Sequence, residues 1–221
     1  MGDLISLAER RATLGPGHGW RRSAQATFYF DLVSPFTYLA AERVERLLGA
    51  VRWLPALGAA MSPASATDMS PERVREEAER RAAALHMPLV WPDCFPPQTR
   101  AAMRAAAYAC EAGRGDAFAL AASRLAYCGG FDLEDPEVLA EAAAAAGVSL
   151  SRCLQAAGDA ARDERLEATA RRLVIAGADR LPAVRVGRLL VCGEERIGEA
   201  AARISDSALR GAPRTGESLT S

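Results

Sequence analysis

The fold of this chain is decided by the segment Phe28-Tyr29-Phe30-Asp31-Leu32-Val33-Ser34-Pro35-Phe36-Thr37. Its first residues belong to a short aromatic run from Ala26 to Leu32, and such a run is typical of a β-strand. Serine is a favoured N-cap and proline at the first helical position sacrifices no hydrogen bond, so Ser34-Pro35 predicts a helix start. Apolar residues recur at helical spacing as far as Leu48, and Gly49 supplies a stop. We therefore expect a strand-to-helix turn here.

A second strand is predicted just after this helix, over residues 51–57, with Pro55 marking its end or a sheet edge. Strand, helix and strand in such close succession form a βαβ unit, whose two strands pair in parallel. From Ser70 to about residue 157 the chain is instead rich in alanine, arginine and glutamate. Helices are predicted there at about 71–85, 98–113, 115–128, 135–146 and 149–157.

Strands return near the end of the chain. A long helix over about 159–176 precedes two short apolar segments, 183–186 and 189–191, whose Gly187-Arg188 separator predicts a tight hairpin. A final helix is expected from about 194 to 204. The order predicts an α/β protein whose βαβ … αββα framework is interrupted by helices. Its expected parts are a flexible leader at 1–25, a discontinuous domain at 26–60 and 158–206, a helical insertion at 61–157 and a disordered tail at 207–221.

The composition of the 221 residues argues against several kinds of partner and site. Lys and Arg number 27 against 28 Asp and Glu, a net charge of -1, which gives no electrostatic reason to expect nucleic acid or a membrane. No stretch reaches the roughly 20 apolar residues of a membrane span, and the N-terminus lacks a secretory apolar core, so a cytoplasmic protein is expected. The histidines have no companions at ligand spacing, so no metal site is expected. The cysteines form no C-x-x-C pair and are expected to be small buried side chains.

The start of the first helix is where we expect chemistry. A helix N-terminus carries unpaired N–H groups and about half a positive charge, which stabilise an anion and lower the pKa of a thiol. A redox enzyme would carry cysteines in this turn, but Ser34 and Thr37 provide no sulfur, so a dithiol step is excluded there. The Ser34 hydroxyl could instead hold the thiolate of a bound molecule such as glutathione. The alternative is that Ser34 only caps the helix.

The ordered series of motifs along residues 26 to 205 resembles one known family. The series runs through F-Y-F-D-x-x-S-P-F-x-Y-L-A at 28–40, Pro88-Leu89-x-Trp91-Pro92, Phe95-Pro96-Pro97-Gln98-Thr99, Leu181-Pro182-Ala183 and Gly193-Glu194-Glu195-Arg196-Ile197. It resembles the DsbA-like thioredoxin-fold family, in the branch that contains 2-hydroxychromene-2-carboxylate isomerases and kappa-class glutathione transferases. The resemblance implies a thioredoxin-like fold with a large all-helical insertion.

The resemblance also implies a set of site residues. Glutathione or another low-molecular-weight thiol would be the cofactor, and Ser34 would be the catalytic residue that contacts its sulfur. Leu181-Pro182 would hold a cis peptide bond facing the first helix, the alternative being a trans proline at the start of an edge strand. Glu195 stands where the family has an aspartate for the γ-glutamyl end, the alternative being an acid pair that stabilises a helix start. The expected cofactor-binding residues are Ser34, Pro35, Phe36, Gln98, Leu181, Pro182, Glu194 and Glu195.

The activity implied by the resemblance is isomerisation of, or transfer to, a small aromatic or conjugated electrophile through a bound thiolate. The sequence departs from the family at Gln98, Cys128 and Glu195, where asparagine, an aromatic residue and aspartate are usual. The alternative is a DsbA-like oxidoreductase in name only, a thiol- or ligand-binding protein without dithiol redox activity. Family relatives are often dimers, so a homodimer is an expected assembly.

Overall fold

The computed structural model describes residues 26–61 and 69–211, and these contain a four-stranded mixed sheet. Its strands are β1 (Ala26–Phe30), β2 (Val51–Pro55), β3 (Ala183–Val186) and β4 (Leu189–Cys192). The strand order is β2-β1-β3-β4, with β1 parallel to β2, and with β3 antiparallel to both β1 and β4. The predicted βαβ unit and the predicted hairpin thus join into one sheet.

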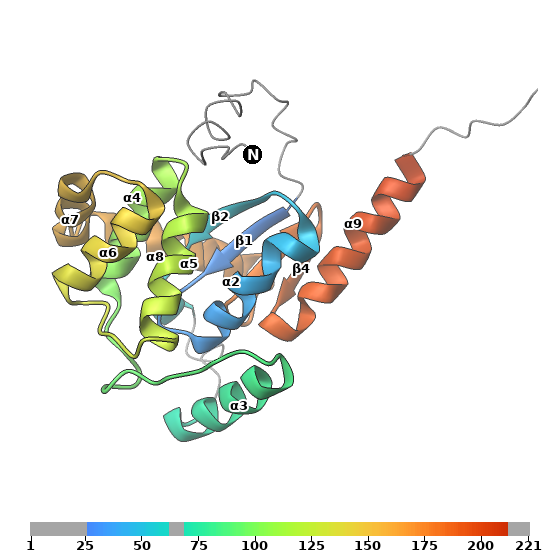
Figure 1. Cartoon of the computed structure of the whole chain (residues 1–221). Coiled ribbons are helices and arrows are strands. Elements are labelled where there is room, and N and C mark those ends of the chain that lie inside the picture. The colour runs from blue at the N-terminus through green and yellow to red at the C-terminus, as the bar shows by residue number, and fades with distance from the viewer. Residues whose placement is uncertain (1–25, 62–68, 212–221) are drawn as a thin grey trace, which may run out of the picture.

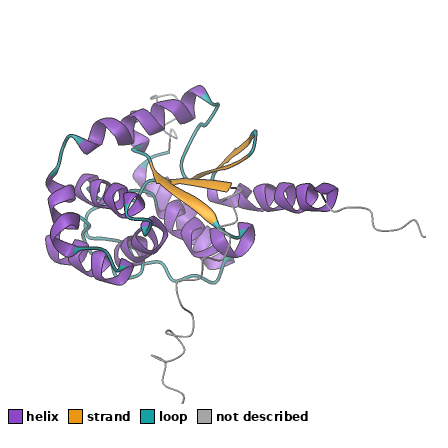
Figure 2. Ribbon diagram, turned by 90° about the horizontal axis from the view of Figure 1, so that it is seen from above, coloured by secondary structure: helices purple, strands orange, loops and turns teal. Residues whose placement is uncertain are grey.

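Helices cover both faces of this sheet, because alternate side chains of a strand point to opposite faces. Phe28 and Phe30 of β1 belong to the main core, whereas Tyr29 and Ala183 face a smaller cluster that includes Leu173. The helices involved are α2 (Pro35–Leu48) and α9 (Ile197–Gly211) on the first face and α8 (Arg162–Ile175) on the second. Figures 1 and 2 show the sheet lying between these helices.

The chain between β2 and β3 is helical, as predicted. A 3-10 turn, η1 (Gly58–Ala60), is followed by α3 (Pro71–Ala84), α4 (Arg100–Glu111), α5 (Gly115–Tyr127), α6 (Pro136–Ala146) and α7 (Leu150–Gly158). Helices α4 to α7 gather beside the sheet, with α5 against α2 and α4 against β2, whereas α3 lies apart from them near α2 (Figure 1). Within the described residues, no helix combines the length and the apolar character needed to cross a bilayer. The expected fold class, with its large helical insertion, is confirmed.

Several predicted boundaries were wrong. Strand β1, expected to reach Leu32, ends at Phe30. Strand β2 ends at Pro55, two residues earlier than predicted, although the Ala56 amide still donates to the Phe30 carbonyl (2.9 Å). Helix α8 begins at Arg162, because the Asp159 carboxylate accepts a hydrogen bond from the Ala161 amide (3.1 Å) and holds the preceding residues in a turn. The last helix begins after a 3-10 turn, η2 (Glu194–Arg196), and continues to Gly211, so residues 207–211 are helical. The predicted leader and the rest of the predicted tail lie outside the described residues.

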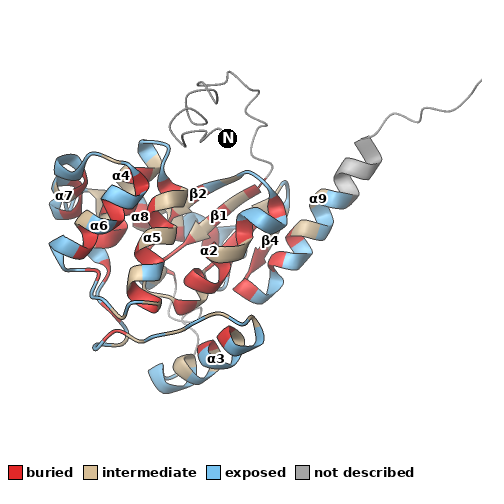
Figure 3. Cartoon of the chain, in the orientation of Figure 1, coloured by how far each residue is buried: buried red, intermediate tan, exposed pale blue. Residues whose placement is uncertain are grey.

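Helix α3 is attached to the rest of the molecule more weakly than the other helices near the site. Figure 3 shows buried residues concentrated along α2, the sheet and the inner faces of α4 and α5, while α3 is largely exposed. Ala78 and Ala82 are its only buried residues. Its remaining ties to the body are polar, and they lead directly to the candidate site.

Candidate functional site

A cavity of about 560 Å³ lies between the N-terminus of α2, the turn η1, helix α3 and the segments beside the hairpin. Pro71, Val74 and Arg81 recur at helical spacing, so one face of α3 forms one wall. The cavity brings together five of the residues expected from the sequence. These are Ser34, Pro35, Phe36, Leu181 and Glu195.

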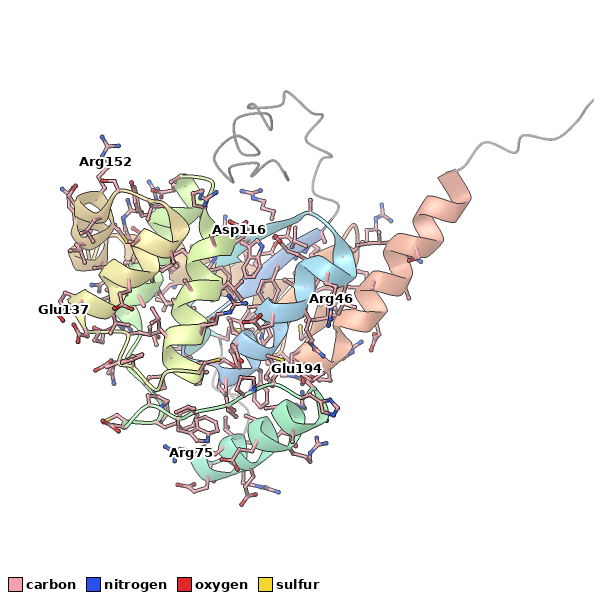
Figure 4. All side chains as sticks on the ribbon, viewed as in Figure 1. Arg46, Arg75, Asp116, Glu137, Arg152 and Glu194 are labelled. Carbon is pink, nitrogen blue, oxygen red and sulfur yellow. The ribbon has the colours of Figure 1, made fainter. Side chains whose placement is uncertain are left out.

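The other three expected residues do not line this cavity. Gln98 is exposed just before α4. Pro182 is buried, and its carbonyl accepts a hydrogen bond from the Gly193 amide (2.8 Å). The side chain of Glu194 is only 3% exposed. Its carboxylate lies 2.5 Å from Arg43 and 3.1 Å from Arg81, and these two arginines balance its buried charge. Figure 4 shows Glu194 beside α2. Glu194 therefore anchors η2 to α2 and α3.

Ser34 occupies the N-cap position of α2 with an extended backbone, but its side chain makes no capping hydrogen bond. Ser70, the N-cap of α3, also precedes a proline, but its side chain behaves differently. There the serine Oγ accepts a hydrogen bond from the Arg73 amide (3.4 Å). The Ser34 hydroxyl lines the cavity instead, so it remains available to a ligand.

Leu181 lines the cavity. The Leu181-Pro182 peptide bond is cis. Among the described residues, no backbone group pairs with the N–H or C=O of Leu181. A ligand with an extended peptide backbone could use these two groups.

Asp31 is a cavity residue that the sequence analysis did not single out. Its side chain is buried, and its two oxygens accept hydrogen bonds from the amides of Val33 (3.1 Å) and Gly58 (2.6 Å). Burial raises the pKa of Asp31 to about 6, although the two amides oppose the change. The sequence did carry a signal for Asp31, because it is an acidic residue at the end of an aromatic strand and three residues before Ser34. Asp31 places a titratable carboxyl beside the turn and ties that turn to η1.

Two arginines, also missed from the sequence, bring positive charge to the cavity. Arg81 donates to Glu195 Oε2 (2.5 Å) and Arg180 donates to Glu195 Oε1 (2.6 Å). Burial opposes ionisation of Glu195, but its own backbone amide and the two arginines outweigh burial and lower its pKa. Arg81 also lies over the Phe36 ring, with its guanidinium carbon 5.0 Å from the ring centre. Glu195 is thus held as a paired carboxylate.

Tyr127 supports the turn from the α5 side, where its hydroxyl donates to the Val33 carbonyl (2.6 Å). Burial, with the nearby charge of Asp31, raises the pKa of Tyr127 well above its ordinary value, so it remains a neutral donor. The Sγ of Cys128 lies 2.9 Å from the hydroxyl of Tyr38, and Cys128 does not line the cavity.

The cysteines differ from one another in burial. Cys153 and Cys192 are buried, as expected, and Cys110 and Cys128 are partly buried. Cys94 is exposed, contrary to expectation, because it lies in the loop between Trp91 and Phe95. None of them contributes to the cavity wall. The site therefore offers a hydroxyl, a helix N-terminus, an apolar surface and paired charges, but no thiol of its own.

Comparisons with known proteins agree with this architecture. The family model described as DSBA-like thioredoxin domain matches residues 25–205. The structure is similar to a 2-hydroxychromene-2-carboxylate isomerase, with a TM-score of 0.73 and 17% identity over 86% of this chain and 99% of that chain. It is also similar to a probable DsbA oxidoreductase from Streptomyces coelicolor, with a TM-score of 0.61 and 20% identity over 88% of this chain and 93% of that chain. No curated protein matches the sequence.

Proposed function

This chain belongs to the DSBA-like thioredoxin domain family, and from that premise we propose that it is a glutathione-dependent isomerase or transferase. The isomerase would be of the 2-hydroxychromene-2-carboxylate isomerase type, and the transferase would be kappa-like. The substrate would be a small aromatic or conjugated electrophile. One observation carries the proposal: the hydroxyl of Ser34 stands at the N-terminus of α2, makes no cap and lines a cavity. Dithiol exchange at this turn would need sulfur atoms that Ser34 and Thr37 do not have.

The cavity suits glutathione or another small thiol in size and polarity. Its volume falls within the range of roughly 300 to 1,000 Å³ that small-molecule sites occupy. The backbone groups of Leu181 suit an extended peptide, and the terminus of α2 suits an anion. Bound glutathione would supply a thiolate that adds to a conjugated carbon and is later eliminated.

Three features of the chain would support this chemistry. Ser34 would donate a hydrogen bond to the thiolate, and the first turn of α2 would add its partial positive charge, so both would lower the pKa of the thiol. The side chains of Phe95 and Leu181 would keep water from the reacting carbon. Asp31 would hold the turn in place through the amides of Val33 and Gly58.

The proposed function can be tested by replacing Ser34 and Ser70, two serines that each precede a proline at the start of a helix. Glutathione is expected to raise the Tm, and Ser34→Ala is expected to reduce glutathione-dependent turnover of 2-hydroxychromene-2-carboxylate by about 100-fold. The free energy of unfolding should hardly change, because Ser34 makes no cap. Ser70→Ala is the matched control and should lower the free energy of unfolding by about 0.5 to 1 kcal/mol, because Ser70 does cap its helix.

Two results would count against the proposal. The absence of any Tm shift with glutathione or another small thiol would contradict it. A Tm shift without turnover by the unmodified protein would favour a thiol-binding protein that has no catalytic activity.

A further inference from the structure

The polar end of the cavity is filled by a side chain of the protein itself. The carboxylate of Glu195 lies between Arg81 (2.5 Å) and Arg180 (2.6 Å), and all three residues line the cavity. The Glu195 side chain folds back over Gly193, so that a Cβ at position 193 would overlap its carboxylate oxygens. Gly193 also has a φ of 91°, a backbone conformation that other residues rarely adopt. This backbone allows Glu195 to sit between the two arginines.

The two arginines do not depend on Glu195 for their positions. Arg81 also binds Glu77 (2.5 Å) and the buried Glu194 (3.1 Å). Arg180 also binds Asp179 (3.0 Å). The Glu195 side chain, by contrast, is 35% exposed and has room to rotate toward solvent. Partly exposed ion pairs contribute little net stability, so Glu195 is the replaceable member of the group.

The chemistry of this position favours an anion over a cation. Arginine forms paired hydrogen bonds with carboxylates, and here two arginines converge on one carboxylate. Glu77, Glu194 and Asp179 neutralise part of this positive charge, but once Glu195 turns away the two guanidinium groups face a position that fits a carboxylate and does not fit a cation. An incoming carboxylate would replace an outgoing one, which leaves the charge of the cluster unchanged. Phe95 and Leu181 line the same cavity and provide apolar surface for the rest of the ligand.

We propose that Arg81 and Arg180 form a carboxylate-binding subsite, which Glu195 fills in the free protein and from which an acidic ligand displaces it. The proposal rests on the proposed function in taking this cavity as the ligand site. It adds that the ligand carries a carboxylate and that Glu195 sets selectivity by competing with it. A ligand without a carboxylate cannot take the place of Glu195 between the arginines, so its affinity should not depend on Glu195.

Isothermal titration calorimetry of two thiols tests the proposal. Glutathione carries carboxylates, whereas N-acetylcysteamine carries none. Glu195→Gln is expected to tighten glutathione binding about fivefold, because the competing charge is gone, and to leave N-acetylcysteamine binding unchanged. Arg180→Gln is expected to weaken glutathione binding by a similar factor. Glu199→Gln, which removes a carboxylate paired with Arg196 outside the cavity, is the matched control and should change neither affinity.

The outcomes separate this proposal from the proposed function. Weaker glutathione binding in Glu195→Gln would overturn the subsite and would mean that Glu195 receives the ammonium group of the ligand. Unchanged glutathione binding in Glu195→Gln and Arg180→Gln would also overturn the subsite, while thiol binding would still support the proposed function. If neither thiol binds, the proposed function fails, and trans-cinnamate, an aromatic carboxylate, becomes the probe. Tighter cinnamate binding in Glu195→Gln would then uphold the subsite, and no cinnamate binding would overturn it.

Discussion

Asp31 is a carboxyl group whose ionisation is disfavoured in the folded protein. Burial raises its pKa from 3.8 to about 6, so the folded state binds this proton more tightly than the unfolded state does. The resulting stabilisation is complete below pH 3.8 and is lost as the pH rises through about 6. A shift of this size corresponds to about 3 kcal/mol. We therefore expect Asp31 to make the protein less stable near neutral pH than near pH 4.

Urea denaturation of the unmodified protein and of Asp31→Asn measures this effect. Asparagine cannot ionise, so the free energy of unfolding of the variant should rise by about 2 to 3 kcal/mol relative to that of the unmodified protein between about pH 4 and about pH 7.5. Arg80 and Arg81 lower the pKa of Glu77 to about 2, so Glu77 loses its stabilising effect only at lower pH and does not interfere. If the difference in free energy of unfolding between the two proteins does not change with pH, the raised pKa of Asp31 is contradicted.

The site residues that could be predicted from the sequence are those marked by their immediate neighbours in the chain. Ser34 follows an aromatic strand and precedes a proline, and Leu181 precedes both a proline and a strand. Arg80 and Arg81 are indistinguishable in the sequence, yet the first is 68% exposed and the second is 22% exposed and reaches the cavity. Their roles depend on the rotation of α3 about its axis, which tertiary packing decides.

The link between α2 and η2 depends on the ion pair between Arg43 and Glu194. Arg43 lies 2.5 Å from the Glu194 carboxylate and also donates to the Glu194 carbonyl (3.0 Å). Removing one partner leaves a buried charge less well paired, which is costly. Arg43→Met is expected to lower the free energy of unfolding by about 2 to 4 kcal/mol, because Arg81 compensates only in part.

Arg46→Met is the matched control for this prediction. Arg46 lies on the same helix, is exposed and makes no ion pair with a described residue, so its removal should change stability by less than about 0.5 kcal/mol. The double variant Arg43→Met with Glu194→Gln should be more stable than Arg43→Met alone, since the buried charge is removed. Equal stability of Arg43→Met and Arg46→Met in chemical denaturation would show that Arg43 is not needed to hold η2.

Sequence reasoning identified the type of each of these elements, and it failed at some of their ends. Glycine, proline and serine mark most helix and strand boundaries, which is why α3 to α7 lie within one or two residues of their predicted ranges. The end of α9 was missed because the polar residues after Ile204 resemble a tail. Helix α9 packs Ile197 and Ala200 against the core, and its regular backbone extends beyond this contact.

At the scale of the whole molecule, α3 forms one wall of the cavity but contributes little to the core. Its ties are the hydrogen bond from Trp91 to Glu79 (2.8 Å), the contacts of Arg75 with the rings of Trp91 and Phe95 (both 5.1 Å) and the ion pairs of Arg81. Figure 4 shows Arg75 on α3, beside the loop that carries these rings. Segments with few buried apolar contacts open locally before the core does.

Hydrogen exchange should therefore distinguish α3 from the rest of the structure. We expect the amides of α3 to exchange at least about tenfold faster than those of α2, and glutathione to slow α3 selectively. Helix α6, which does not line the cavity, serves as the internal control and should not change. Exchange in α3 that matches α2 and does not respond to glutathione would mean that α3 is a fixed wall with no part in binding.

If Ser34 and the N-terminus of α2 hold the sulfur of a bound thiol as a thiolate, the pKa of bound glutathione must be lower than that of free glutathione. Thiolate absorbance in the ultraviolet, recorded against pH with saturating protein, gives this value. Bound glutathione is expected to titrate at least about one unit below the ordinary thiol value of about 8.5, and Ser34→Ala is expected to move the pKa back toward that value. A bound thiol that titrates as it does in free solution, or whose pKa is unaffected by Ser34→Ala, would contradict the proposed role of Ser34.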